Sequence, residues 1–308
     1  MIKDILNGKA NMSIRAADIL FALVIAMRSS ALLFSMIAMR GLEPFNVLAI
    51  RFGFAFLIIL VIFRKRFAAL DGKTILHGFI LGIAFFMCMA FEMLALTMIT
   101  SSETAFLENL AMIFVPLIEA VLLRRAPHAS ALISAGVSLV GVRLLTIGSD
   151  AALSMSLGEI LAILGAFSFA IVIIATDRFS KSDDSLMLGI LEIGFIGVFS
   201  LIISFLFESP SLPSSASQWG AIAYLVIVAS CIGFVLQPVA QSCTTSEHSG
   251  LISSLNPLVA AVLGAIFLGE RLGLKGIIGA ALILFAVVLQ NLLEQRRKRA
   301  RGGTDIKL

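Results

Sequence analysis

Ten apolar stretches of about 20 residues follow one another along this chain of 308 residues. Each is long enough to cross the hydrocarbon core of a bilayer, which is roughly 30 Å thick. Only helices and closed barrels can pair all their backbone groups in lipid, and unbroken apolar runs lack the alternation of barrel strands. The sequence therefore predicts an all-α polytopic membrane protein. Its ten spans are expected near residues 17–40, 45–63, 75–98, 103–123, 129–147, 157–177, 186–207, 218–241, 248–268 and 275–293.

The composition leaves little chain for an aqueous domain, because 59% of the residues are hydrophobic. Any functional site is therefore expected inside the bundle. The three cysteines show no metal-ligand spacing, so we expect neither a metal nor another cofactor. The net charge of +4 does not indicate nucleic acid, because the basic residues gather at span ends, where lipid headgroups lie. Membrane lipid is the expected partner.

The basic residues also predict the orientation of the chain. Of the 23 Lys and Arg residues, 17 fall on the side that holds both termini, including the segment 1–16 and the basic tail 294–308. Positively charged connections are retained in the cytoplasm. Both termini are therefore expected to be cytoplasmic, and we expect the cytoplasmic (inner) membrane of a bacterium.

The chain also aligns with itself at an offset of 145 residues, which places Thr104 over Ser249. Spans 4 and 5 then correspond to spans 9 and 10, so the chain divides into five-helix halves at 17–147 and 157–293. Because five is odd, the two halves insert in opposite directions. Inverted repeats of this kind are typical of secondary transporters, whose site lies between the repeats near the membrane midplane.

The run SGLISSLNPLVAAVLGAIFLGERL from Ser249 to Leu272 carries a family resemblance. With Pro257, the pair Gly269-Glu270 and an arginine early in span 2, Arg51, the chain resembles EamA-type transporters of the drug/metabolite transporter superfamily. The resemblance implies ten helices in two inverted repeats and transport of small metabolites or drugs.

The first half departs from this pattern. The self-alignment places Met112 opposite Pro257 and Arg124-Arg125 opposite Gly269-Glu270, while Pro116 lies four positions after Met112. A proline bend in span 4 is therefore expected about one turn away from its counterpart in span 9.

Ionisable side chains inside a span usually face a cavity or one another. Arg51, Glu92, Glu108 and Arg143 are expected at one level, in the periplasmic half of the membrane. Arg28, Glu92 and Glu108 are candidates for a substrate path or a proton-coupling site, since arginine can grip an anion and a glutamate can carry a proton. Arg51 could do the same, or it could fasten helices through an ion pair, and Arg143 could snorkel or pair at an interface. The full set is Arg28, Arg51, Glu92, Glu108, Glu119, Arg143 and Glu192.

Uncharged polar groups extend the candidate path. Gln237 and Gln241 lie four residues apart on one helix face, and Asn256 precedes a proline. They could orient a substrate or only join helices, which is worth about 0.6 kcal/mol per hydrogen bond in membranes. Helix breaks are expected at three prolines, which leave carbonyl groups unpaired: Pro116, Pro238 and Pro257.

Small residues four apart allow helices to approach closely. The pairs are Gly78 with Gly82, Ser134 with Ser138, and Gly276 with Ala280. Packing within the chain explains them, and a homodimer through the second and third pairs is a further prediction.

The leading functional hypothesis is a secondary carrier of amino acids or related solutes, working by alternating access, with export as the expected direction. No GxxxxGK[ST] motif is present, so a gradient or exchange must drive transport. Drug efflux and metabolite uptake are alternatives. A membrane-embedded enzyme or a receptor is a further alternative, but neither HExxH nor GxSxG occurs, and no catalytic residue is predicted.

Overall fold

The computed structural model describes residues 14–67, 70–124, 129–146, 155–179, 183–233, 236 and 256–302. Across these ranges the regular structure is helical and contains no strand. Seven helices are uninterrupted: α2 (Ile14–Ala38), α3 (Pro44–Phe67), α4 (Gly72–Leu96), α7 (Ala129–Thr146), α8 (Leu157–Phe179), α9 (Ser185–Phe207) and α14 (Leu274–Gly302). The shortest of them is α7. The interrupted helices are α5 (Ser101–Glu108) with α6 (Ala111–Leu122), α10 (Ala216–Tyr224) with η1 (Leu225–Ile232), and α13 (Asn256–Leu263) with η2 (Gly264–Leu268).

Every predicted span overlaps one of these helices or helix pairs. By length and composition, six stretches could cross a membrane, among them α5 and α6 taken together. Four further apolar helices are shorter in the described part of the chain: Leu132–Leu145, Ala216–Ile232, Asn256–Leu268 and Leu274–Leu289. The all-helical class is thus confirmed, and the count of ten spans stays a prediction.

Two predicted boundaries differ from the structure. Pro44 was expected in a loop but is the first residue of α3, a position where a missing N–H costs nothing. The expected basic tail is largely helical, because α14 continues to Gly302. The residues after 293 are good helix formers such as Glu, Gln, Arg, Lys and Ala, with no glycine before 302.

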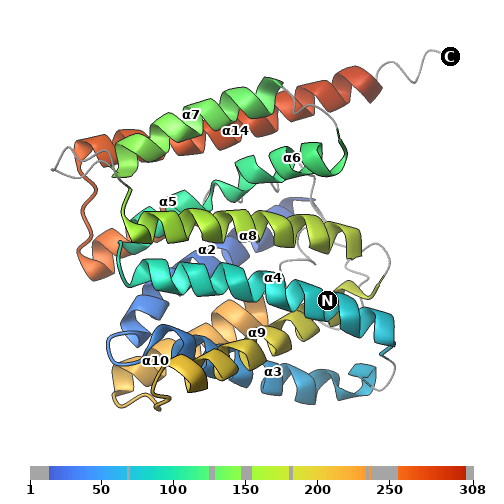
Figure 1. Cartoon of the computed structure of the whole chain (residues 1–308), viewed down its shortest axis with the longest axis vertical. Helices are drawn as coiled ribbons and strands as arrows, with labels where there is room; N and C mark the ends of the chain where they lie inside the picture. Colours follow the sequence, from blue (N-terminus) through green and yellow to red (C-terminus); the bar gives the residue numbers. More distant parts are fainter. Residues whose placement is uncertain are drawn as a thin grey trace.

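The connections gather at two ends of the bundle (Figure 1). Residues 39–43, 97–100, 208–215 and 269–273 lie at one end, which we call the first end. The connections after α3, α6 and α8 lie at the other, or second, end. Several helices have side-chain caps at these ends: Thr100 and Ser215 each form a capping box. At the second end Asp71 caps α4, and the hydrogen bonds from the Thr74 side chain and backbone hold the pKa of its carboxyl below the usual value.

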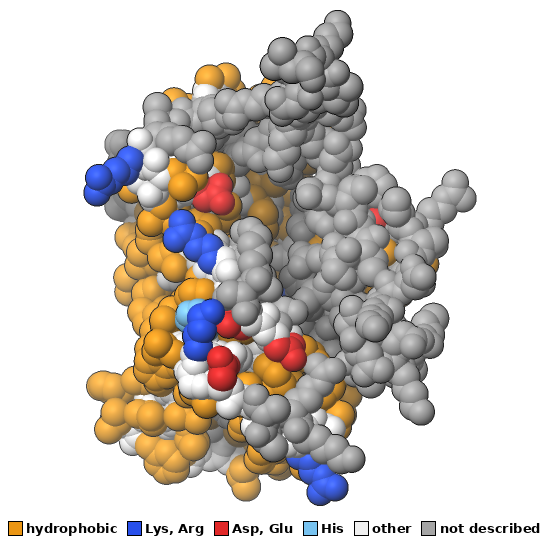
Figure 2. Space-filling model, turned by 90° about the vertical axis from the view of Figure 1, so that its right-hand side faces the viewer, with side chains coloured by type: hydrophobic (Ala, Val, Ile, Leu, Met, Phe, Trp, Pro, Cys, Tyr) orange, Lys and Arg blue, Asp and Glu red, His pale blue; other side chains and the backbone are white. Residues whose placement is uncertain are grey.

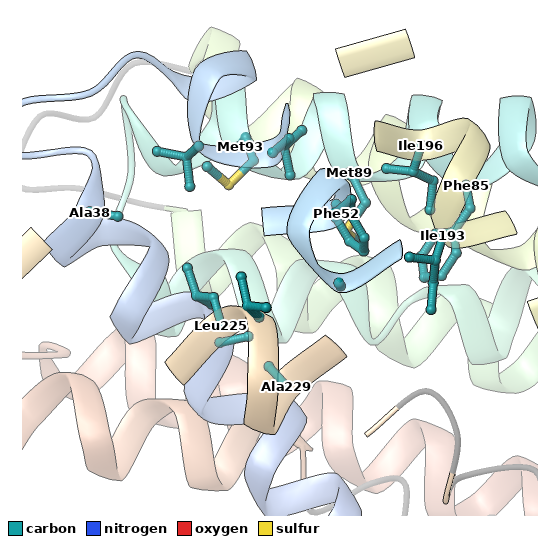
Figure 3. Close-up of a cluster of buried hydrophobic side chains, with 14 of the residues drawn as sticks. Ala38, Phe52, Phe85, Met89, Met93, Ile193, Ile196, Leu225 and Ala229 are labelled. Atoms are coloured by element: carbon teal, nitrogen blue, oxygen red, sulfur yellow. The ribbon is translucent and has the colours of Figure 1, made fainter. Parts of the chain in front are cut away.

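The core is a cluster of buried hydrophobic side chains from several helices (Figure 3). Phe52 on α3, Met89 on α4, Ile193 on α9 and Leu225 on η1 lie together there and are at most 7% exposed. These helices come from both halves of the sequence. The two halves therefore both contribute to this cluster.

Glycines bring two helix pairs into close contact. A Cβ on Gly78 of α4 would lie 2.6 Å from the Leu191 Cβ of α9, and one on Gly82 would overlap the Cβ of Phe195. In the same way, a Cβ on Gly141 of α7 would lie 2.9 Å from the Gly279 carbonyl of α14. The pair of α7 and α14 lies along one edge of the bundle (Figure 1).

The small residues predicted at a dimer interface are used within the chain. Ser134, Ser138 and Ala280 are buried in the single chain, where α7 packs against α14. The spacing of these residues therefore serves a contact inside the molecule, and the homodimer stays a prediction.

Backbone geometry recurs at the offset of 145 residues. Among the described residues, positive φ angles occur at Arg124 (48°) and Gly269 (70°), which are aligned positions. The helices α6 and η2 end at Leu122 and Leu268, within one residue of the same offset. Two distant segments of the chain thus end a helix in the same way.

The second end of the bundle carries charged side chains over part of its surface, beside apolar flanks (Figure 2). Asp183, in the connection before α9, hydrogen bonds the Nδ1 of His77 and lies 3.5 Å from the Lys73 amine. The His77 ring also stacks on Phe179, with ring centroids 4.0 Å apart. These contacts join the first turns of α4 to the end of α8.

Candidate functional site

Five ionisable side chains from five helices meet in the interior of the bundle. They are Arg28 on α2, Arg51 on α3, Glu92 on α4, Glu108 at the end of α5 and Glu192 on α9, and together they form what we call the charge cluster. Arg28 interacts electrostatically with all three glutamates, and Arg51 interacts with Glu92 and Arg28. Two basic and three acidic groups thus share one apolar interior, where unpaired charges are costly.

The sequence predicted part of this arrangement. Arg51, Glu92 and Glu108 were expected at one level, and the structure brings them together with Arg28 and Glu192. Arg143 was expected at the same depth with a snorkelling or interface role, and it lies on α7, which packs mainly against α14. Glu119 is exposed on α6. Hydropathy predicts the depth of a residue in a span but not which neighbour its helix packs against.

Arg51 has a defined partner in the second half of the chain. Its Nε donates a hydrogen bond to Ser230 Oγ on η1 at 2.9 Å, and its guanidinium lies 4.7 Å from the centre of the Phe52 ring. The side chain is only 4% exposed. Together with the charge of Glu92, these contacts fasten α3 to η1 and α4, which is the helix-joining role considered for Arg51.

Glu92 and Glu108 form a carboxyl pair. Their side chains hydrogen bond to each other. A carboxylate can only accept hydrogen bonds, so a hydrogen bond between the two groups requires at least one of them to be protonated. The Oε1 of Glu108 is buried and has no hydrogen-bond partner among the described residues. This oxygen can accept a further proton or a hydrogen bond from a ligand.

Hydroxyl groups line α2 beside Arg28. Ser29 Oγ lies 2.5 Å from the Asn256 Oδ1, at the start of α13. Ser30 Oγ lies 2.7 Å from the hydroxyl of Tyr224, whose ring stacks on Phe34 at 3.9 Å. Asn256, a predicted site residue, therefore contacts the residue next to Arg28. This hydrogen bond joins α13 of the second half to α2 of the first half, which fits the alternative that Asn256 only joins helices.

The sequence reasoning missed Ser29, Ser30, Tyr224 and Ser230. Single hydroxyl groups are common in apolar spans, so composition does not single these out. Tyr224 offers one signal, because it is the only tyrosine in the chain and lies within an apolar stretch. The predicted residues Gln237, Pro238 and Gln241 lie outside the described residues.

The fourth apolar stretch is broken, but not at Pro116. Helix α5 ends at Glu108 and α6 begins at Ala111, whereas Pro116 lies inside α6. Pro257 is the second residue of α13, where a missing N–H is tolerated. The turn at Asn109 and Leu110 puts Glu108 at the end of α5. Both turn residues keep right-handed helical backbone angles, and their N–H groups bond the carbonyls of Ala105 and Leu107.

The charge cluster can exchange a proton and can hold a polar or charged solute through arginine, carboxyl and hydroxyl groups. No group of three or more His, Cys, Asp and Glu side chains in the described ranges is arranged to hold a metal ion. Ionisable groups inside a membrane bundle usually face a cavity or one another.

Two transporters of other organisms and one solved structure are similar to this chain. An uncharacterized transporter from Archaeoglobus fulgidus is 24% identical over 276 residues, which cover 90% of this chain and 86% of that protein. The uncharacterized transporter YcbK of Bacillus subtilis is 31% identical over 80 residues, and the match spans only 26% of either protein. A solved structure titled "Crystal structure of protein" has a TM-score of 0.65 at 19% identity and covers 92% of this chain and 99% of that one, which shows a shared fold.

The family match covers most of the chain. It extends over residues 15–147 and 156–292, in two segments that correspond closely to the two halves of the self-alignment. These segments contain all five members of the charge cluster. The chain is an integral membrane protein that belongs to the EamA-like transporter family.

Proposed function

We propose that this protein is a secondary carrier that exports amino acids or related small metabolites by alternating access. The observation that carries the proposal is the charge cluster, in which five ionisable groups from five helices meet inside an apolar bundle. A purely structural bundle has no need to bury so many charges, because well-packed apolar residues hold helices at less cost.

We propose further that the halves 17–147 and 157–293 are inverted five-helix repeats, giving ten spans. Support comes from the equivalent positive φ angles of Arg124 and Gly269 and from a family match in two segments. Four members of the charge cluster belong to the first half, whereas Glu192 and Asn256 belong to the second. A site between two repeats is what alternating access requires.

The proposed location is a bacterial inner membrane with both termini in the cytoplasm. The excess of Lys and Arg in the connections after spans 2, 4 and 6 supports this orientation. The first end of the bundle, with the connection 208–215, then faces the periplasm.

Proton coupling is proposed to use the pair of Glu92 and Glu108. A hydrogen bond between the two carboxyl groups requires a proton on at least one of them, and Oε1 of Glu108 can accept another hydrogen bond. Arg28 lies close enough to both to favour release of the proton or to receive the carboxylate of a substrate.

The test uses purified protein and individual amino acids as probes. We expect at least one amino acid to raise the melting temperature and to show saturable counterflow in proteoliposomes. If only cationic drugs raise the melting temperature and show counterflow, the result favours drug efflux. Binding without flux would contradict the carrier and favour a receptor or an enzyme.

A further inference from the structure

The carboxylate of Glu270 caps the N-terminus of α5. Its Oε1 accepts hydrogen bonds from the N–H and the hydroxyl of Ser101, both at 2.8 Å. Its Oε2 accepts hydrogen bonds from the N–H of Ser102 at 3.1 Å and from the Ser102 hydroxyl at 2.5 Å. A negative charge at this place also interacts favourably with the helix dipole. We call these four hydrogen bonds the Glu270 cap.

The end of the η2 helix is shaped to bring Glu270 into this position. The π-helical turn of η2 is followed by Gly269 with a φ of 70°, and the Glu270 N–H then bonds the Gly264 carbonyl at 3.2 Å. A Cβ on Gly264 would overlap the Glu270 carboxylate and would lie 2.9 Å from Ser102 Oγ. Two glycines are therefore needed for the cap to form.

The Glu270 cap is connected to the charge cluster by one short, rigid element. Helix α5 is 8 residues long, with the cap at its first two residues and Glu108 at its last. At 1.5 Å per residue, the cap and Glu108 are separated by roughly 10 Å along the helix. A tight turn at Asn109 and Leu110 joins α5 to α6. Movement of the first turn of α5 would therefore carry Glu108 with it.

A second carboxylate cap at the same end has a different setting. Glu208 accepts hydrogen bonds from the N–H groups of Phe45 at 2.8 Å and Asn46 at 2.7 Å, at the start of α3. However, α3 is an unbroken helix that packs against α9 along its length. The Glu208 cap therefore lies at the start of a long helix, whereas the Glu270 cap lies at the start of a helix of 8 residues.

The sequence indicates that the Glu270 cap has no equivalent at the other end of the bundle. Arg125 occupies the position aligned with Glu270 at the offset of 145. A guanidinium group has no acceptor and cannot cap the N–H groups of a helix. The two ends of the proposed carrier are therefore chemically different.

We propose that the Glu270 cap is a gate at the first end of the bundle. Release of α5 from Glu270 opens a path from this end to the charge cluster. The inference rests on the proposed alternating access and assigns one of its two gates to named residues.

The gate can be tested without a substrate, through the native thiol of Cys88. This thiol is 3% exposed and interacts with Arg28 and the glutamates of the charge cluster, so it reports access to the interior. A form with Cys231 and Cys243 replaced by serine is labelled with a membrane-impermeant maleimide, added to either face of membrane vesicles. A separate Leu212→Cys variant identifies the face at which the connection 208–215 lies.

We expect Glu270→Gln to speed labelling of Cys88 from the Leu212 face about tenfold, equivalent to about 1.4 kcal/mol in favour of the open form. Gly264→Ala should also speed the labelling of Cys88 from the Leu212 face while keeping the charge of Glu270. It replaces Glu270→Gln as the test variant if Glu270→Gln does not fold. Glu103→Gln removes a carboxylate from the same helix turn, but glutamine preserves the local capping box. Labelling in this control should change less than twofold.

Three results would overturn the gate. They are unchanged labelling in Glu270→Gln and Gly264→Ala, equal acceleration from both faces, or an equal acceleration in Glu208→Gln, which would indicate general loosening. Because labelling needs no substrate, these results are independent of whether amino acids are transported. A carrier with normal counterflow but no change in labelling would lose the gate and keep the proposed function.

Discussion

Single buried polar side chains in this bundle differ in whether they have a partner. Ser230 Oγ receives the hydrogen bond of the Arg51 Nε at 2.9 Å, whereas Ser200 Oγ on α9 is buried and has no partner in the described structure. We expect Ser230→Ala to lower the free energy of unfolding by about 1–3 kcal/mol, because it leaves a buried charged donor unpaired. Thermal unfolding in detergent measures the effect.

Ser200→Ala is the matched control for this prediction. It also removes one buried hydroxyl, but no partner is left behind, so the melting temperature should stay the same or rise. Equal losses in both variants would mean that Arg51 does not depend on Ser230.

At the scale of helices, glycine allows some helix pairs to approach more closely than any larger residue would permit. Gly82 lets α4 approach α9 so closely that a Cβ would overlap the Cβ of Phe195, which cannot swing away. Gly82→Ala should therefore cost about 1–3 kcal/mol of stability through overpacking. A Cβ at Gly136 on α7 would have no neighbouring atom within 4 Å, so Gly136→Ala should raise the melting temperature through its higher helix propensity. A stable Gly82→Ala protein would contradict the close contact.

The break within the fourth apolar stretch shows where sequence patterns stop being informative about elements. Proline is the usual signal for a break, yet Pro116 lies within α6 and the helix ends earlier, at Glu108. Asn109 and Leu110 carry no strong helix-breaking signal. Helix α5 packs against α8 and α13, and a single sequence does not reveal such neighbours.

At the scale of the whole molecule, hydropathy predicted the helical class and the approximate bounds of the helices. The clustering of Arg51, Glu92 and Glu108 could be anticipated from their depth in the spans, because ionisable groups inside a membrane usually pair with one another. An interface position for Arg143 was among the expectations, whereas the contact of Glu270 with Ser101 could not be anticipated. That contact depends on which helices are neighbours, and apolar helices look alike to one another in sequence.

The charge cluster draws on both halves of the chain. Arg28 interacts electrostatically with Glu92 and Glu108 of the first half and with Glu192 of the second, and its neighbour Ser29 contacts Asn256. A change in the angle between the halves would alter these contacts together. The charge cluster is therefore suited to link movement of the bundle to the binding of a solute or a proton.

The central claim is that the carboxyl pair inside the bundle takes part in transport, and amino-acid counterflow in proteoliposomes tests it most directly. Glu92→Gln and Glu108→Gln should each reduce flux at least tenfold with normal expression, because glutamine cannot carry a proton. Glu119→Gln, which alters an exposed glutamate outside the charge cluster, should keep nearly normal flux. Normal flux in both Glu92→Gln and Glu108→Gln would contradict the account and leave the charge cluster with a structural role.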